Sequence, residues 1–114
     1  MIKIFEIWIA DLNPRIDTEP GKKRPVLVVQ SNLLNKIPHP STIICPITTH
    51  TKSEAQILRV SLKRGQANLK KDSHVLIDQI RAIDNQRLVE KLGSLPIDLI
   101  DEVRRNLSIV LDLD

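Results

Sequence analysis

A short basic run contains the residue best suited to anion chemistry. Lys22, Lys23 and Arg24 place three positive charges in a row, directly before Pro25 and the apolar run Val26–Val29. The guanidinium of Arg24 stays protonated at neutral pH and offers several planar donors to a phosphate. Pro25 fixes the backbone at the start of a predicted strand, which limits the freedom of Arg24. By position alone, a solvated loop arginine is the simpler interpretation.

Two threonines and a polar pair in a strand are the next candidates. Thr48 and Thr49 follow the apolar run Ile43–Ile47, and their hydroxyl groups can donate or accept a hydrogen bond where the chain leaves a strand. Threonines at strand ends are common, so position alone does not assign them a role. Gln79 and Arg81 share one face of the longest predicted strand by the two-residue repeat. That face either meets solvent or lines a groove.

The remaining titratable residues fit no familiar catalytic or metal-binding motif. The spacing of His39, His50 and His74 matches no metal motif, and three scattered glycines do not make a phosphate-binding loop. A two-histidine ribonuclease would need the fold to bring His50 and His74 together, which is the less favoured alternative. Cys45 is the only cysteine, and its apolar neighbours predict a small buried hydrophobe rather than a nucleophile. The sequence therefore predicts neither a metal nor a cofactor.

The totals describe one globular domain spanning residues 1–114. Hydrophobic residues make up 41% of the chain and charged residues 27%, and a chain of 114 residues can bury a core without disulfides. The net charge of +3 and pI near 9.2 permit an anionic partner without demonstrating one. We expect a cytoplasmic protein, because no stretch reaches the roughly 18 apolar residues of a membrane span and the N-terminus lacks a signal-peptide layout.

Alternating and continuous apolar runs predict several short strands that position these residues. Arg24 lies just before the strand predicted over Val26–Ser31, and Thr48 ends the strand predicted over Thr42–Thr48. The other predicted elements are strands over Phe5–Leu12, Ile57–Leu62, His74–Ile83 and, more ambiguously, Val89–Leu95, with short turns over Leu33–Asn35 and Asn85–Leu88, the latter capped by Asp84.

The last segment, Pro96–Leu111, is the one convincing long helix. Proline suits its first turn, and an apolar stripe repeats at helical spacing over Ile100, Val103, Leu107 and Val110. Strands followed by one helix predict a mostly β (α+β) domain, namely a small antiparallel β-barrel with the C-terminal helix as its lid. Closing the barrel would remove the edges that such aliphatic strands otherwise expose.

Four blocks in order resemble the MazF/PemK toxin ribonucleases of bacterial toxin–antitoxin pairs. The blocks are Ile7–Pro14, Glu19–Ser31, Ile43–Thr48 and Asp72–Leu88, so the resemblance covers nearly the whole chain. It implies an SH3-like small β-barrel of the CcdB/MazF kind with a C-terminal helix. It also implies a homodimer that cuts single-stranded RNA, mRNA above all, at short sequences without a metal, leaving a 2′,3′-cyclic phosphate and a 5′-hydroxyl. The implied partner is an antitoxin whose acidic tail fills the RNA groove.

The resemblance also implies roles for individual residues. Its catalytic arginine and threonine fall on Arg24 and Thr48, and its RNA-contacting glutamate and glutamine fall on Glu19 and Gln79. The further substrate-binding residues that we expect are the neighbouring polar and basic side chains, namely Lys22, Lys23, Thr49 and Arg81, with Lys70 or Lys71 as additional phosphate contacts. The sequence departs from the family pattern in three places: Phe5-Glu6 replaces Gly-Asp, and Asp17 and Lys22 replace loop glycines, which bears on the loop conformation and on the cleavage preference.

The expected reaction uses the 2′-hydroxyl of the RNA as the nucleophile. Arg24 would stabilise the extra negative charge, and Thr48 would bond a non-bridging oxygen or position the 2′-hydroxyl. No residue is evident as the general base. Two other functions stay open: a CcdB-like gyrase poison, which needs neither Arg24 nor Thr48, and a barrel that binds RNA without cutting it.

Overall fold

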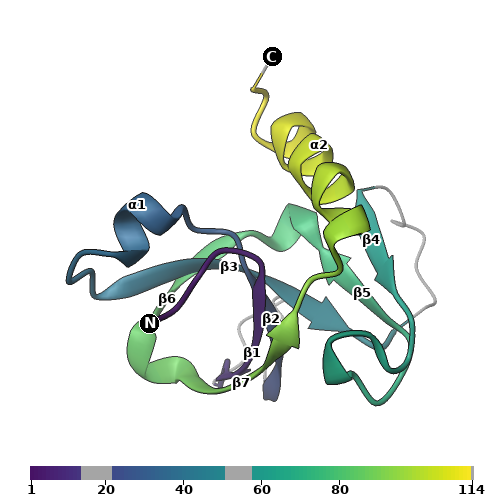
Figure 1. Ribbon diagram of the computed structural model, residues 1–114, viewed down its shortest axis with the longest axis horizontal. Helices are drawn as coiled ribbons and strands as arrows, with labels where there is room; N and C mark the ends of the chain where they lie inside the picture. Colours follow the sequence, from purple (N-terminus) through teal and green to yellow (C-terminus); the bar gives the residue numbers. More distant parts are fainter. Residues whose placement is uncertain (14–21, 51–57, 114) are drawn as a thin grey trace.

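The computed structural model describes residues 1–13, 22–50 and 58–113. In this part of the chain, seven strands precede a C-terminal helix (Figure 1). The strands are β1 (Glu6–Asp11), β2 (Lys23–Val28), β3 (Ser41–Thr48), β4 (Arg59–Leu62), β5 (Ser73–Leu76), β6 (Arg81–Asp84) and β7 (Leu88–Ser94), and the α-helices are α1 (Asn32–Asn35) and α2 (Ile100–Val110). Neither described helix has the length and apolar character that crossing a bilayer requires.

The strands form one antiparallel sheet in the order β4-β5-β3-β2-β1-β7. Strand β3 is its centre, because β2 pairs with one side of it while β5 and β6 share the other. Strands β4 and β7 end the path, so the ladder formed by the described residues is not closed. The segment after β4 approaches β7 instead: Asn68 Nδ2 donates to Leu92 O at 2.6 Å, and a Cβ on Gly93 would lie 3.0 Å from the Ala67 backbone. The architecture is therefore barrel-like without a continuous ring of strand pairs.

Alternation along the strands builds two aliphatic clusters. One lies under α2 and includes Ile7, Leu27, Cys45 and Val75. The other lies on the opposite face of β1, β2 and β3, where Ala10, Val26, Val28, Ile44 and Ile83 pack together. Successive side chains of a strand point to opposite faces of the sheet, so alternate residues join different clusters.

The C-terminal helix forms as the sequence predicts. A 3₁₀ turn over Ile97–Leu99 leads into α2, and Asp101 and Glu102 lie in its first turn, where the helix dipole favours negative charge. Val103 is fully buried, and the rest of the predicted stripe (Ile100, Leu107 and Val110) packs against the same cluster. Burial of this stripe fixes the helix across one end of the sheet, which confirms the predicted lid (Figure 1).

The second strand begins and ends earlier than predicted. The sequence predicted Val26–Ser31, but β2 covers Lys23–Val28 because β1 extends far enough to pair with the basic run, with Asp11 opposite Lys23 and Ala10 opposite Arg24. The chain leaves the sheet before Ser31, whose hydroxyl accepts the Leu33 N–H at 3.1 Å and caps α1. Arg24 is consequently a strand residue rather than a loop residue.

The predicted long strand His74–Ile83 is interrupted. A 3₁₀ turn over Ile77–Gln79 separates β5 from β6, although both pair with the same side of β3. Val75 lies opposite Ile47, whereas Arg81 lies opposite Ile44, so the pairing register shifts by three residues between them. The turn directs Ile77 into the core, where it is fully buried. The apolar repeat did not reveal this insertion, because Ile77 is apolar in either conformation.

The other predicted elements are confirmed within one or two residues. These are the strands observed as β1, β3 and β7, the turn observed as α1, and the turn over Asn85–Arg87, whose cap Asp84 accepts the Gln86 N–H at 2.8 Å. The strand predicted over Ile57–Leu62 is described from Leu58 onward and begins at Arg59. Residue Ile57 lies outside the described residues.

Candidate active site

The pairing of β2 with β3 brings Arg24 and Thr48 together. Val26 lies opposite Pro46, and extending this register by two residues places Arg24 opposite Thr48. Directly opposed residues of an antiparallel pair have Cβ atoms about 4.5–5.5 Å apart and share one face. In agreement, Arg24 Nη1 donates to the backbone oxygen of Ile47, next to Thr48, at 3.5 Å. Two residues 24 positions apart in sequence are therefore neighbours at one end of the sheet.

Both side chains are held by the surrounding structure. Arg24 is half-buried between β1 and β3, and Thr48 is 8% exposed. Thr48 Oγ1 accepts the backbone N–H of His50 at 3.1 Å, which fixes the hydroxyl where the chain leaves β3. A protonated guanidinium beside a fixed hydroxyl can bind a phosphate and stabilise added negative charge on it. Thr49 and His50 follow on the exposed rim.

Lys22 and Lys23 extend the positive charge beside Arg24, and both are exposed. Lys22 has a φ of 66°, its N–H donates to Asn13 Oδ1 at 2.8 Å, and its carbonyl accepts the Leu12 N–H at 2.9 Å. The left-handed conformation that favours glycine is thus present at this position although the residue is lysine. Glu19 and Asp17 lie outside the described residues.

Gln79 and Arg81 do not share a strand face. Gln79 belongs to the 3₁₀ turn, and Arg81 begins β6, so the two-residue repeat does not apply across them and that prediction is wrong. Arg81 pairs with Ile44, four residues before Thr48 on β3. At about 3.3 Å per residue, Arg81 and Thr48 are separated by about 13 Å along that strand. The structure therefore places Arg81 outside the immediate surroundings of the Arg24–Thr48 pair.

His74 belongs to no motif in the sequence, but the fold places it in the partner position of Thr48 on β5. Its Nδ1 lies 3.1 Å from Ser61 Oγ on β4. The usable signal was topological: β3 ends at Thr48, and an antiparallel partner that begins with Ser73-His74 must place its first residues beside that end. His50 lies two residues after Thr48, and its carbonyl accepts a hydrogen bond from Arg59 Nη1 at 3.2 Å.

Cys45 is confirmed as a buried core residue. Its side chain has no exposed surface and belongs to the cluster under α2. Burial, together with the negative charge of Asp78, raises the pKa of the thiol to about 12. The thiol is therefore protonated at neutral pH and does not act as a nucleophile.

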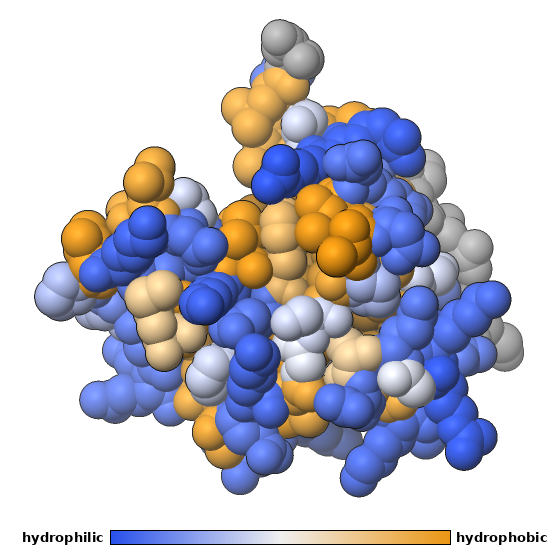
Figure 2. All heavy atoms as spheres, viewed as in Figure 1, coloured by the Kyte–Doolittle hydropathy of each residue, from blue (hydrophilic) through white to orange (hydrophobic). Residues whose placement is uncertain are grey.

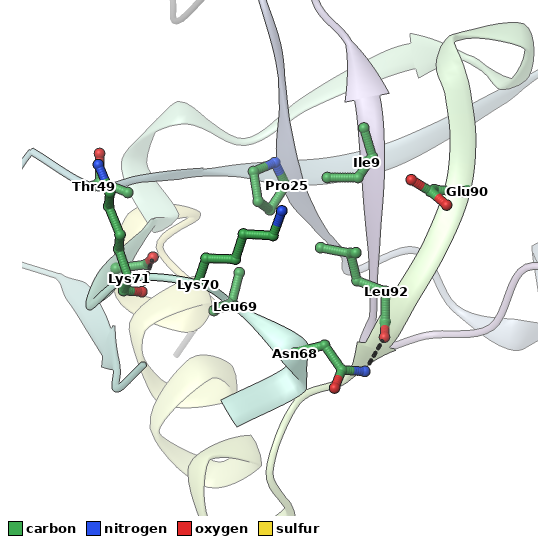
Figure 3. Close-up of a pocket in the computed structure, with 10 residues that line it drawn as sticks. Ile9, Pro25, Thr49, Asn68, Leu69, Lys70, Lys71, Glu90 and Leu92 are labelled. Carbon is green, nitrogen blue, oxygen red and sulfur yellow. Dashed lines mark hydrogen bonds between the residues drawn. The ribbon is translucent and has the colours of Figure 1, made fainter. Parts of the chain in front are cut away.

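A pocket of about 430 Å³ opens on the other face of the same sheet end (Figure 3). Its apolar walls include Ile9, Pro25, Leu69 and Leu92, and its rim contains Thr49, Asn68, Lys70, Lys71, Ser73 and Glu90. Pro25 and Thr49 are the chain neighbours of Arg24 and Thr48, so the pocket adjoins the pair around the end of the sheet. Figure 3 shows the Lys70 side chain reaching toward Pro25 and Glu90 standing across from it.

The sequence matches the family model described as "PemK-like, MazF-like toxin of type II toxin-antitoxin system" over residues 3–111. The chain belongs to this family. The match extends from before β1 almost to the end of the chain, so the fold and the Arg24–Thr48 pair both lie inside it. The predicted resemblance to MazF/PemK toxins is confirmed.

Individual relatives agree with the family assignment. Endoribonuclease EndoA of Bacillus subtilis (strain 168) is 34% identical over 113 residues, which cover 99% of this chain and 97% of that protein. The crystal structure of MazF from Deinococcus radiodurans superposes with a TM-score of 0.79 at 26% identity, covering 98% of this chain and 97% of that one. A mycobacterial endoribonuclease solved with its cognate antitoxin has the same fold, with a TM-score of 0.79 at 17% identity and coverage of 100% and 98%. The predicted MazF-like architecture with a C-terminal helix is thereby confirmed.

Proposed function

We propose that this protein is an endoribonuclease toxin that cuts single-stranded RNA at short sequences and leaves a 2′,3′-cyclic phosphate and a 5′-hydroxyl. The observation that supports this proposal most directly is the pairing of Arg24 with Thr48 at the end of β2 and β3. The chain belongs to a toxin family and is 34% identical over nearly its full length to a protein named an endoribonuclease. Membership of that family favours RNA cleavage over a general anion-binding role for the pair.

The proposed reaction needs no metal, because RNA supplies its own nucleophile. The 2′-hydroxyl attacks the adjacent phosphorus, and the negative charge that builds on the phosphate oxygens faces the Arg24 guanidinium. Thr48 Oγ1 accepts the His50 N–H, and its O–H group then donates to a non-bridging oxygen or orients the 2′-hydroxyl. A planar guanidinium holds two phosphate oxygens at once, which a lysine ammonium does not reproduce.

The proposed RNA-binding surface extends from this pair along the basic rim. Lys22 and Lys23 are exposed beside Arg24, and Lys70 and Lys71 line the adjoining pocket. Contacts from such side chains to RNA phosphates position the strand without reading its bases. Glu19, Gln79, Thr49 and Arg81 remain the proposed polar contacts to RNA. The same cationic rim would bind the acidic tail of an antitoxin, which would block access of RNA.

We also propose that the protein is a cytoplasmic homodimer. Apolar side chains are exposed on and after α1, with Leu33 78% and Ile37 54% exposed, and near the end of α2, with Ile109 58% exposed. Figure 2 shows hydrophobic surface over α1 and below α2 on the face in view. A second copy would cover such a surface, which a monomer leaves in water. Analytical ultracentrifugation of the purified protein measures the expected dimer mass, and a monomer at micromolar concentration would contradict it.

Direct incubation with RNA tests the proposed function. Purified protein is mixed with a long single-stranded RNA that contains many different short sequences, and the 5′ ends created by cleavage are sequenced. We expect cleavage at one recurring short sequence by the native protein and loss of cleavage in Arg24→Ala. Intact RNA with the native protein would refute the proposal and favour a toxin that acts on another target, such as gyrase, or a barrel that only binds RNA.

A further inference from the structure

A polar row crosses the sheet at the end where Arg24 and Thr48 lie. The register that places Arg24 opposite Thr48 continues on the next strands, where His74 lies opposite Thr48 and Ser61 lies opposite His74. Residues opposed in this way extend their side chains from one face of the sheet. The intervening residues Ile47 and Val75 belong to the core under α2, so the row faces the other way.

We propose that His74 is a catalytic residue of this row, acting as the general base that removes the proton of the RNA 2′-hydroxyl. This inference rests on the proposed endoribonuclease function and supplies the base that the Arg24–Thr48 pair lacks. Adjacent strands are about 4.8 Å apart, so Arg24 and His74 begin roughly 10 Å apart on either side of Thr48. That interval accommodates a phosphate beside Arg24 and the adjacent 2′-hydroxyl beside His74, with Thr48 between them.

The contact between His74 and Ser61 orients the imidazole for this role. The two side chains meet through Nδ1 and Oγ at 3.1 Å, and His74 is only half-buried. In the tautomer that a base requires, Nδ1–H donates to Ser61 Oγ and the lone pair is on Nε2, the ring nitrogen on the side away from Ser61. Ser61 therefore acts as a positioning residue, because it fixes which nitrogen can reach the substrate.

The charged and titratable residues around His74 lie on two neighbouring strands and next to the strand ends. Arg59 on β4 and Arg24 on β2 are cations, Asp72 lies just before β5, and His50 follows β3. The Asp72 carboxylate accepts the Arg64 N–H at 2.8 Å, and Arg59 donates to the His50 carbonyl.

The step balances without a further reactant. Nε2 takes the proton of the 2′-hydroxyl while the 2′-oxygen forms a bond to phosphorus, and the bond from phosphorus to the 5′-oxygen breaks. The departing 5′-oxygen takes a proton from solvent, and the imidazolium returns its proton to solvent afterwards. The products are the 2′,3′-cyclic phosphate and the 5′-hydroxyl of the proposed function.

Single-turnover cleavage of a short RNA oligonucleotide that the native protein cuts tests the role of His74. We compare native protein, His74→Gln and His74→Ala with His39→Gln, a matched histidine variant before β3 whose ring contacts Ser41 O. We expect the His74 variants to lose about 10²- to 10⁴-fold in kcat and His39→Gln to retain native activity. Native kcat should fall as the pH is lowered, because a protonated base cannot accept the 2′-hydroxyl proton, and this decrease should vanish in His74→Gln. Added imidazole should restore part of the activity of His74→Ala.

A second substrate separates the base from an acid. An RNA with sulfur in place of the bridging 5′-oxygen needs no proton on its leaving group, so loss of a base still slows its cleavage. Three results would overturn the assignment. They are a native cleavage rate of His74→Ala on this substrate, a change in KM alone, and native pH dependence in His74→Gln. Melting curves of each variant exclude unfolding, and partial rescue by imidazole occurs only in a folded site. Absence of cleavage by the native protein would instead overturn the proposed function and this inference together.

Discussion

Replacing Thr48 by valine removes one hydroxyl group and preserves the shape of the side chain. Thr48 is 8% exposed, and its hydroxyl accepts one hydrogen bond, from the His50 N–H at 3.1 Å. Losing that bond costs about 0.5–1.5 kcal/mol of net stability. A domain stable by about 5–15 kcal/mol therefore stays folded. If the hydroxyl contacts the transition state, its removal should lower the cleavage rate about 10²- to 10³-fold, a much larger effect.

The assay combines single-turnover cleavage of a single-stranded RNA with urea unfolding of the same protein samples. Thr48→Ser is the matched control, because it restores the hydroxyl without the methyl group and should keep the rate within a few-fold. A valine variant that retains more than a tenth of native activity would refute the assigned role. So would a serine variant as slow as the valine variant, since the hydroxyl would then be irrelevant.

Three further predictions concern stability. Glu6→Ala should lower the free energy of unfolding by about 2–3 kcal/mol, measured by urea unfolding at pH 7. The reason is that Glu6 accepts hydrogen bonds from the Lys3 N–H at 2.8 Å and Trp8 Nε1 at 3.1 Å and pairs with Lys91 Nζ at 2.8 Å. An unchanged urea midpoint would contradict this prediction. Burial alone raises the pKa of Glu6, but these hydrogen bonds and the Lys91 charge together hold it below its ordinary 4.5. The stability that Glu6 contributes as a carboxylate is therefore complete above pH 4.5 and is lost as the pH falls through the lowered pKa. The difference in free energy of unfolding between native protein and Glu6→Gln should consequently decrease in acid. A difference that does not change with pH would exclude this linkage. Lys22→Gly should stabilise the protein by up to about 1 kcal/mol, because the lysine has a φ of 66°, which glycine adopts without strain. A clearly lower melting temperature for the variant would show that the lysine side chain contributes more to stability than its backbone strain costs.

Most of the fold could be predicted from the sequence, because the apolar pattern of each segment agrees with the helix, strand or turn that the segment forms. The stripe on α2, the cap at Asp84 and the run Ile43–Ile47 each match the structure that forms. The pattern could not reveal the turn at Ile77–Gln79, because an isoleucine that enters the core from a turn is indistinguishable from one in a strand. It also could not reveal how far β2 extends, since that depends on β1 as its partner.

The residues of the candidate site could be predicted from the sequence, but their positions relative to one another could not. Arg24 and Thr48 were recognised from residue type and from family resemblance, but their adjacency follows from the β2–β3 register, which is a property of the tertiary structure. Likewise, the position of His74 opposite Thr48 depends on strand pairing rather than on spacing along the chain. Short-range patterns specify elements, whereas a site assembled from four strands requires their register.

In the proposed reaction, the guanidinium of Arg24 supports the cleavage of RNA without a metal. The most direct test measures cleavage of one single-stranded RNA by native protein and by Arg24→Ala in excess EDTA, with mass spectrometry of the product ends. We expect full native activity, products ending in a 2′,3′-cyclic phosphate and a 5′-hydroxyl, and a rate at least about 10³-fold lower in a folded Arg24→Ala. Native activity in Arg24→Ala, or loss of native activity in EDTA, would contradict it.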